Sequence, residues 1–278
     1  MKLRIALALM GLCLPGWAQA ADNPFVVKLP FATAEIKYQL KGSEKGTAVL
    51  YVDGQRSARV VDTTLTIMGG SHPKKSITIT TPEKVIEVDL VARQAKATGN
   101  MSTYLAEEFE KLSPTEKAAV QKNAEKWGAS MAQAFAGAPP QVSTGTFKGK
   151  PVDIATVAGF TSQTWKGTGI VLRHQGSMMG INMDEEAVSI ETGGAVKAGV
   201  FDVPAGIPVS FDKEQDQMQR QMAKATLDLL KDLQFETKLK QGGGKPGRMM
   251  MTPPPGAPQD DDEDDDEAPA AKVPQRRR

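Results

Sequence analysis

The chain has 278 residues, a formal net charge of +1 and an aromatic content of only 5%. A near-neutral chain with few aromatic side chains lacks the clustered cations and stacking platforms of nucleic-acid-binding proteins, so we exclude that class. Its single cysteine, Cys13, excludes a disulfide framework, cysteine-ligated zinc, iron–sulfur clusters and c-type haem.

The first twenty residues have the pattern of a secretory signal peptide. Lys2 and Arg4 form a positive start, residues 5–14 are apolar, and Ala18-Gln19-Ala20 is a small-x-small cleavage pattern. The apolar run is shorter than the ~20 residues that span a bilayer, and no later segment is apolar for long enough to do so. We therefore predict that residues 1–20 are removed on export to the periplasm.

Cys13 raises the alternative of a lipoprotein signal, in which it would carry the lipid. Leu12 stands where such a signal has a small residue, so we favour simple cleavage. The exported chain would then contain no cysteine and would be held by its core alone. That is feasible, because a chain of ~200 residues buries about 70% of its unfolded surface.

Residues 31–93 have the pattern of an antiparallel meander. Apolar residues such as Ile36 and Tyr38 alternate with charged ones, which indicates strands with one dry face. Asp53-Gly54 is a strong hairpin signal, and residues 69–73, with His72, predict another turn. The predicted strands are 34–41, 47–52, 56–68, 76–80 and 84–90.

Residues 100–137 form a helical island between two strand-like blocks. Ser113 and Glu116 make a capping box around Pro114, which starts the main helix. Apolar residues then recur at steps of three and four and give one stripe along the helix: Val120, Ala124, Trp127, Met131 and Phe135. This stripe either packs against the sheet as ordinary core or covers a ligand cavity.

Residues 141–204 repeat the strand pattern with closely spaced glycine turns, of which Gly176-Ser177 is one. The predicted strands are 152–157, 160–166, 170–175, 178–183 and 187–192. Short strands at such intervals favour a sheet curled into a half-barrel. The predicted fold class is therefore α+β: a curved antiparallel sheet with a helical insertion covering its concave face, a C-terminal helix and a disordered tail.

Two stretches carry a resemblance to a known family. Residues 51–56 (Tyr-Val-Asp-Gly-Gln-Arg) run from a strand into a hairpin, and residues 200–206 (Val-Phe-Asp-Val-Pro-Ala-Gly) close the second block. With the order of signal, meander, helices and meander, they resemble the periplasmic lipoprotein-carrier superfamily of the LolA/LolB type, in a poorly characterised branch of bacterial envelope proteins. The resemblance spans roughly residues 31–209.

That resemblance implies a concave sheet that holds acyl chains or another hydrophobic ligand under its helices. The residues that we expect to line such a cavity are Tyr38, Trp127, Met131, Phe135, Leu172 and Met179. A pocket of about 300 Å³ or more beneath residues 127–135 would favour this reading.

The C-terminal part changes character. Residues 212–235 predict a helix capped by Asp212, with Met218, Met222, Ala225, Leu229 and Leu233 along one face. This helix either packs back on the domain or offers an amphipathic surface to a partner. The predicted boundaries are 1–20 for the signal peptide, 21–210 for the half-barrel, 211–240 for the helix and 241–278 for the tail.

Eight acidic residues in a row, 260–267, favour disorder in the tail. The run either solvates the chain or binds calcium weakly or a basic partner; it lacks the glycine and distal glutamate of an EF-hand loop. Residues 241–247 superficially resemble a phosphate loop but lack its second glycine and the following Ser/Thr, so we reject that reading.

Nothing in the sequence indicates an enzyme. His72 falls in a predicted turn and His174 in a predicted strand, and no catalytic motif accompanies either. We expect no cofactor and no metal. Two hypotheses follow: a periplasmic binding protein for a lipid or other hydrophobic small molecule, or an envelope scaffold that contacts another protein through its C-terminal helix and acidic tail.

Overall fold

The computed structural model describes residues 23–67, 70–136, 139–178 and 181–235, and the predicted signal peptide and tail lie outside these ranges. The strands in chain order are β1 (Thr33–Lys41), β2 (Glu44–Asp53), β3 (Arg56–Ile67), β4 (Gly70–Thr80), β5 (Lys84–Asp89), β6 (Gln94–Gly99), β7 (Gln141–Phe147), β8 (Lys150–Val157), β9 (Phe160–Trp165), β10 (Val171–Met178), β11 (Ile181–Thr192) and β12 (Val209–Phe211). The helices are α2 (Met101–Glu110), α3 (Pro114–Ala136) and α4 (Lys213–Leu230).

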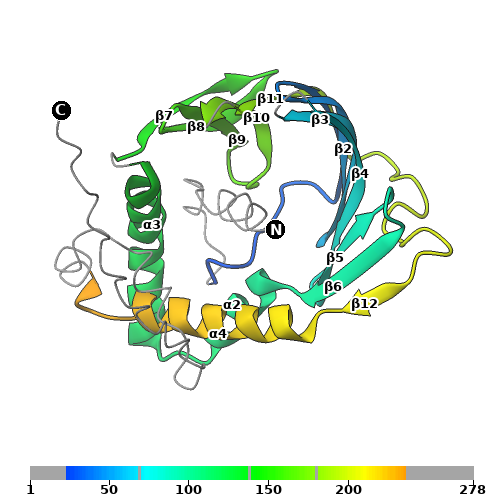
Figure 1. The fold of residues 1–278 in the computed structure, drawn as a ribbon. Helices are drawn as coiled ribbons and strands as arrows, with labels where there is room; N and C mark the ends of the chain where they lie inside the picture. The colour runs from blue at the N-terminus through cyan, green and yellow to red at the C-terminus, as the bar shows by residue number, and fades with distance from the viewer. Residues whose placement is uncertain (1–22, 68–69, 137–138, 179–180, 236–278) are drawn as a thin grey trace, which may run out of the picture.

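All the described strands belong to one open sheet of twelve, in the order β12-β6-β5-β4-β3-β2-β1-β11-β10-β9-β8-β7. Antiparallel pairing of β1 with β11 joins the two strand blocks, and among the described strands only β12 is parallel to its neighbour. The sheet curves strongly, and the helices lie opposite its concave side, between its two ends (Figure 1). The predicted α+β class with a curved, antiparallel sheet is confirmed.

The first block follows the predicted hairpins with one correction. Gly54 takes a positive φ of 59° in the Asp-Gly turn between β2 and β3. His72, which we predicted in a turn, lies exposed within β4, where it pairs with Leu65 of β3. The prediction was wrong because β3 is long, and β4 pairs with it along its whole length, back to Gly70.

The second block also departs from the predicted turns. Gly176 lies inside β10 instead of in a turn. A glycine stands here because a Cβ at this position would lie 2.5 Å from the ring of Phe160. Of the two strands predicted at 178–183 and 187–192, Met178 ends β10, residues 179–180 lie outside the described ranges, and the rest forms one continuous strand, β11. A register irregularity in its pairing with β1 lets this long strand follow the curve of the sheet.

Residues 193–208, here called the strap, connect β11 to β12 and run outside the curve of the sheet (Figure 1). Phe201, Val203 and Ile207 of the strap pack on a convex-face cluster that includes Ala58, Ile79, Ile86, Val88, Ala95 and Ala97. β6, β7 and β12 were not among the predicted strands. β6 consists of weak strand formers, and its buried alanines are explained by the close cover of the strap.

The helices begin where the sequence indicated. Ser113 and Glu116 form the capping box of α3, with the Ser113 N–H donating to the Glu116 carboxylate at 2.9 Å. Asp212 caps α4 by accepting from the N–H of Gln215. The buried side of α4, however, is formed by Ala223, Leu227 and Leu230, one position away from the predicted stripe.

Candidate functional site

The predicted cavity-lining residues divide between two separate apolar clusters. Tyr38 and Leu172 are buried in the sheet cluster, which joins β1 and β2 to β8–β11. Trp127 is half-buried in the helical cluster, where its ring meets Phe235 edge to face at 6.1 Å. The side chains of Met131 and Phe135, and Met179 as a whole, lie outside the described residues.

Tyr38 belongs to the concave side of the sheet. Its neighbours in register, Ala48 on β2 and Ala187 on β11, point the same way and away from the strap. The hydroxyl of Tyr38 donates to the Val171 carbonyl at 3.0 Å, and burial raises the pKa of this phenol. Tyr38 is therefore an uncharged side chain packed on the concave side of the sheet.

Four polar residues share this concave side with Tyr38, and we call them the concave polar group: Arg59, Ser162, His174 and Glu185. The Arg59 guanidinium lies 5.0 Å from the Tyr38 ring centroid and binds the Glu185 carboxylate at 2.5 Å. His174 is directly opposite both Glu185 on β11 and Ser162 on β9, so all these side chains share one face.

His174 is held from two sides. Its Nδ1 lies 2.6 Å from the Ser162 hydroxyl, and its ring stacks on Phe160 with centroids 5.7 Å apart. Burial lowers the pKa of His174 and outweighs the attraction of the nearby Glu185 carboxylate, so the ring is neutral at pH 7. Its buried Nε2 has no hydrogen-bond partner among the described residues.

The sequence alone missed Arg59, Ser162 and Glu185 as members of this group. A signal existed for Arg59, because it occupies the same alternating register as Val61 and Thr63 and so places a charge among the residues of the concave face. Ser162 and Glu185 carried no such signal, since their meeting with His174 depends on the register of three strands.

The helical side is fixed to the sheet by Asp216 of α4. Its carboxylate accepts from the Gly99 N–H at 2.8 Å, the Tyr104 hydroxyl at 2.5 Å and Arg220 Nε at 3.1 Å. These donors come from the end of β6, from α2 and from α4 itself. The hydrogen bond from Tyr104 is the main reason why the pKa of Asp216 lies below its usual range.

A second buried contact fixes the other end of α4. The Asn123 side chain of α3 donates to the carbonyls of Leu230 at 2.8 Å and Asp232 at 3.2 Å. The Leu230 carbonyl is at the end of the helix, where backbone acceptors have no partner within the helix. The Asp232 carbonyl lies just beyond it and also accepts from the Phe235 N–H at 3.0 Å. α4 is thus anchored at both ends, and its middle packs on α2 and α3.

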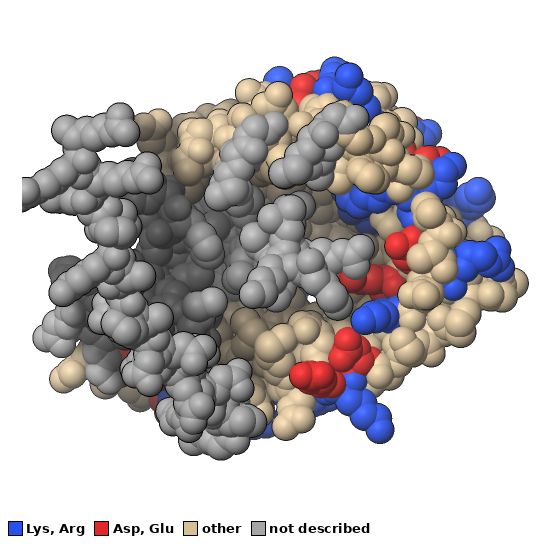
Figure 2. All heavy atoms as spheres, viewed as in Figure 1, with Lys and Arg blue, Asp and Glu red and all other residues tan. Residues whose placement is uncertain are grey.

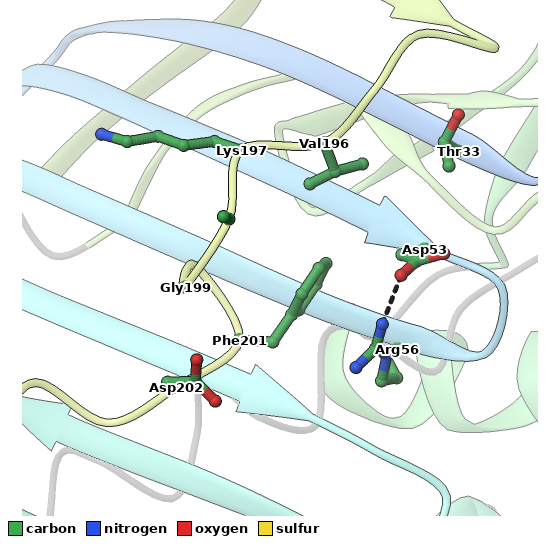
Figure 3. A pocket seen from close by; sticks show the side chains of 9 residues that line it. Thr33, Asp53, Arg56, Val196, Lys197, Gly199, Phe201 and Asp202 are labelled. Carbon is green, nitrogen blue, oxygen red and sulfur yellow. Dashed lines mark hydrogen bonds and ion pairs between the residues drawn. The ribbon is translucent and has the colours of Figure 1, made fainter.

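The strap and the β2–β3 hairpin enclose an open pocket of about 370 Å³ on the convex side (Figure 3). Arg56 pairs with Asp53 and lies over the Phe201 ring, 4.8 Å from its centroid. The two stretches that carried the family resemblance, residues 51–56 and 200–206, therefore touch in space. This pocket is on the opposite side of the sheet from the predicted ligand site.

The surface carries no single-sign field on the face seen in Figure 2, where Lys and Arg of the described residues are interspersed with Asp and Glu. Ion pairs at the surface of the described residues include Lys75–Asp62 and Lys74–Glu44. Within the described ranges, no three His, Cys, Asp or Glu side chains gather as metal ligands. No described helix is long and apolar enough to cross a membrane.

The comparisons with known proteins give no family. No protein-family model matches the chain, and no curated protein does. A solved structure of an uncharacterized conserved protein from Thermus thermophilus matches at 10% identity and a TM-score of 0.38, covering 66% of this chain and 92% of that one.

Two further solved structures match at similar levels. PNGF-II matches at 12% identity and a TM-score of 0.34, covering 69% of this chain but only 33% of its own. LprF from Mycobacterium bovis matches at 8% identity and a TM-score of 0.26, covering 60% of this chain and 88% of that one. Identities and TM-scores this low assign neither family nor function.

Proposed function

We propose that the protein is a non-enzymatic periplasmic binding protein, which holds a lipid or other hydrophobic ligand between the concave side of the sheet and the helices. The signal-peptide pattern of residues 1–20 supports export. The resemblance to lipoprotein carriers supports the kind of ligand. Neither the strap pocket nor the concave polar group is required for this proposal.

One observation carries it: the apolar side chains of the sheet and of the helices form two clusters instead of one. Tyr104, Leu105, Phe109, Val120 and Leu227 pack on one another within the helical cluster. Ile36, Tyr38, Leu40 and Ala48 belong to the sheet cluster on the concave side. α4 meets the sheet at β6 and α3 meets it at β8, so the helices bridge the two ends of the curve (Figure 1).

The two clusters offer one tryptophan reporter each. Trp165 stacks on Phe31 in the sheet cluster with ring centroids 5.0 Å apart, and Trp127 lies in the helical cluster. Trp17 lies in the predicted signal peptide and is lost on export. The variants Trp127→Phe and Trp165→Phe of the exported protein therefore each leave one emitting indole.

A long acyl chain brominated along its length is the probe, because bromine quenches an indole only at close range. We expect saturable quenching of both single-tryptophan variants, since the ligand would lie between the two walls. A short brominated acid is the control and should quench neither. Absence of saturable quenching, or quenching of Trp127 alone, would contradict a ligand held against the sheet.

A second candidate is an envelope scaffold that binds another protein through α4 and the residues after it. The predicted apolar stripe of this helix supports it: Met218 is 43% exposed, and Leu233, just beyond the helix, is 81% exposed. A pull-down from envelope extracts that is lost in the double variant Met218→Ser/Leu233→Ser, with probe binding unchanged, would favour this candidate.

A further inference from the structure

The open sheet has two edge strands, β12 and β7, and they differ in how they are protected. Unpaired backbone groups along an edge favour pairing with another strand, so proteins shorten, charge, bend or cover their edges. β12 is three residues long and passes directly into α4. β7 is seven residues long, contains no charged residue and no proline, and pairs with β8 without a register irregularity.

β7 is also open to solvent. Val142 is 56% exposed, and Gln141, Ser143, Thr144 and Thr146 are exposed as well. Successive side chains of a strand point to opposite faces, so both faces of β7 are accessible over residues 141–144. The strand forms one end of the curved sheet (Figure 1). Among the described residues, none of the usual devices therefore prevents a further strand from adding to this edge.

The turn into β8 determines which backbone groups of β7 point outward. Lys148 and Gly149 have positive φ values of 47° and 76°, which is typical of a two-residue turn of type I′. The residues that flank this turn, Phe147 and Lys150, exchange hydrogen bonds, and bonded and non-bonded pairs alternate along the strands from there. The residues whose N–H and C=O groups point away from β8 are therefore Val142, Thr144 and Thr146.

A contact on the far side of β8 agrees with this alternation. Pro151 is opposite Thr146, and its carbonyl accepts from the Lys166 N–H, just beyond β9, at 2.9 Å. The Pro151 carbonyl thus points away from β7, as expected for a non-bonded pair. The described residues give no backbone partner to the outward groups of β7. These groups are available to another strand.

The outward groups are complementary to a second copy of themselves. When two copies of β7 run antiparallel about a two-fold axis at Thr144, this residue faces its own copy, and Val142 of each chain faces Thr146 of the other. All three outward residues of both chains then form hydrogen-bonded pairs. A shift by one residue would set outward groups against inward ones, and a shift by two would leave one outward residue of each chain outside the paired strands. The hydrogen bonds therefore favour one register.

Charge also favours a second copy as the partner. An edge that pairs with itself brings like charges together, and β7 has none to oppose this. Lys148, at the turn, would lie at the opposite end of the pair from its copy. Asp153, opposite Thr144 on β8, would be about 14 Å from its copy, three strand spacings away, where repulsion is weak.

We propose that two copies of the protein pair through β7 about a two-fold axis at Thr144, so that their two sheets continue into one. The proposal is independent of the bound ligand and of the proposed function. A single pair of seven-residue strands buries less surface than the about 1,200 Å² of a standard interface, so the dimer is weak and depends on protein concentration. Pairing about a two-fold axis is closed, so assembly stops at two copies.

Cysteine cross-linking tests the register. Cys13 lies in the predicted signal peptide, so the exported chain has no cysteine of its own. In Thr144→Cys the two Cα atoms would be about 5.5 Å apart, a usual separation in disulfides, and we expect a covalent dimer under mild oxidation. Val142→Cys is the matched control, because this exposed residue would be about 14 Å from its copy. It should cross-link only when it is mixed with Thr146→Cys.

Paired charges test the same contact without a covalent bond. Thr144→Lys and Thr144→Glu each place like charges across the axis, so each alone should sediment as a monomer at concentrations where the unaltered protein dimerises. An equal mixture of the two variants should dimerise again, because Lys and Glu then face each other. Thr66→Lys, at an exposed position of the interior strand β3, is the control and should dimerise as the parent does.

Two results would overturn the proposal. One is a monomer at every concentration, with no excess of cross-linking in Thr144→Cys over Val142→Cys. The other is a dimer that persists in Thr144→Lys, because the two copies would then meet at another surface. Neither result bears on the binding function, which quenching by the brominated chain tests separately.

Discussion

Replacing Asp216 by alanine should destabilise the protein by about 3 kcal/mol, because it removes the acceptor that joins α4 to β6 and α2. The change leaves the Gly99 N–H and the buried Tyr104 hydroxyl without their acceptor, and each such donor costs about 1–3 kcal/mol. Arg220 adds little, since its side chain is 57% exposed. For a domain of this size the melting temperature should fall by about 6–12 °C.

The assay is urea unfolding followed by far-ultraviolet circular dichroism, at pH 7 and in acid. Partners hold the pKa of Asp216 below its unfolded value, so its contribution is complete above the unfolded pKa and is lost as the pH falls through the folded one. The difference between the protein and Asp216→Asn should therefore shrink in acid. The control is Glu214→Gln, which removes an exposed acid from the same helical turn.

A melting temperature of Asp216→Ala within about 2 °C of the parent, or a loss equal to that of Glu214→Gln, would refute this reasoning. It would mean that the carboxylate is solvated and that α4 is held by its apolar face alone. A difference that grows in acid would contradict the sign of the linkage. Either result would also weaken the conclusion that Asp216 fixes α4 to the end of β6.

Three further predictions concern the contacts that fix the helices and the strap to the sheet. Asn123→Ala should cost about 1–3 kcal/mol in urea unfolding, because the carbonyls of Leu230 and Asp232 lose a buried donor, and Asn123→Asp should not restore it. Gly99→Ala should displace the Tyr104 hydroxyl, which would lie 1.5 Å from the new Cβ, and a crystal structure with that hydrogen bond intact would contradict the packing. Phe201→Ala should release the strap, so hydrogen exchange should speed up relative to the parent in residues 200–207 and stay unchanged in β8. An unchanged exchange rate in the strap, or the same increase in the exposed-site control Phe211→Ala, would argue against a packed strap.

The elements that the sequence predicted well are those whose signals are local. The Asp53-Gly54 turn, the Ser113–Glu116 box and the Asp212 cap each depend on residues within a few positions of one another. Alternation of Ile36 and Tyr38 with charged residues likewise indicated which face of β1 is dry. Such features need no knowledge of the rest of the fold.

The misplaced elements depend on partners far along the chain. Gly176 is a typical turn residue, yet it lies in a strand, where the Phe160 ring leaves no room for a larger side chain. β6 has the composition of a loop and becomes a strand because the strap covers Ala95 and Ala97. The buried side of α4 was off by one position because two faces of that helix are apolar, and packing on α2 chose between them.

The candidate site shows the same division. The apolar members Tyr38 and Leu172 could be proposed from alternation, and the structure places both in one cluster. Trp127 was expected with them but lies across the concave side, among the helices. The polar group around His174 could not be predicted, because it arises from the register of β3, β9, β10 and β11.

Native mass spectrometry of the protein purified from its own periplasm tests the binding function most directly, because a carried ligand travels with the folded chain. We predict a complex heavier than the polypeptide from Ala21 onward, which releases an acyl-containing molecule on unfolding. A folded protein with the mass of the bare polypeptide, and no saturable quenching of Trp127 or Trp165 by a brominated chain, would contradict the account.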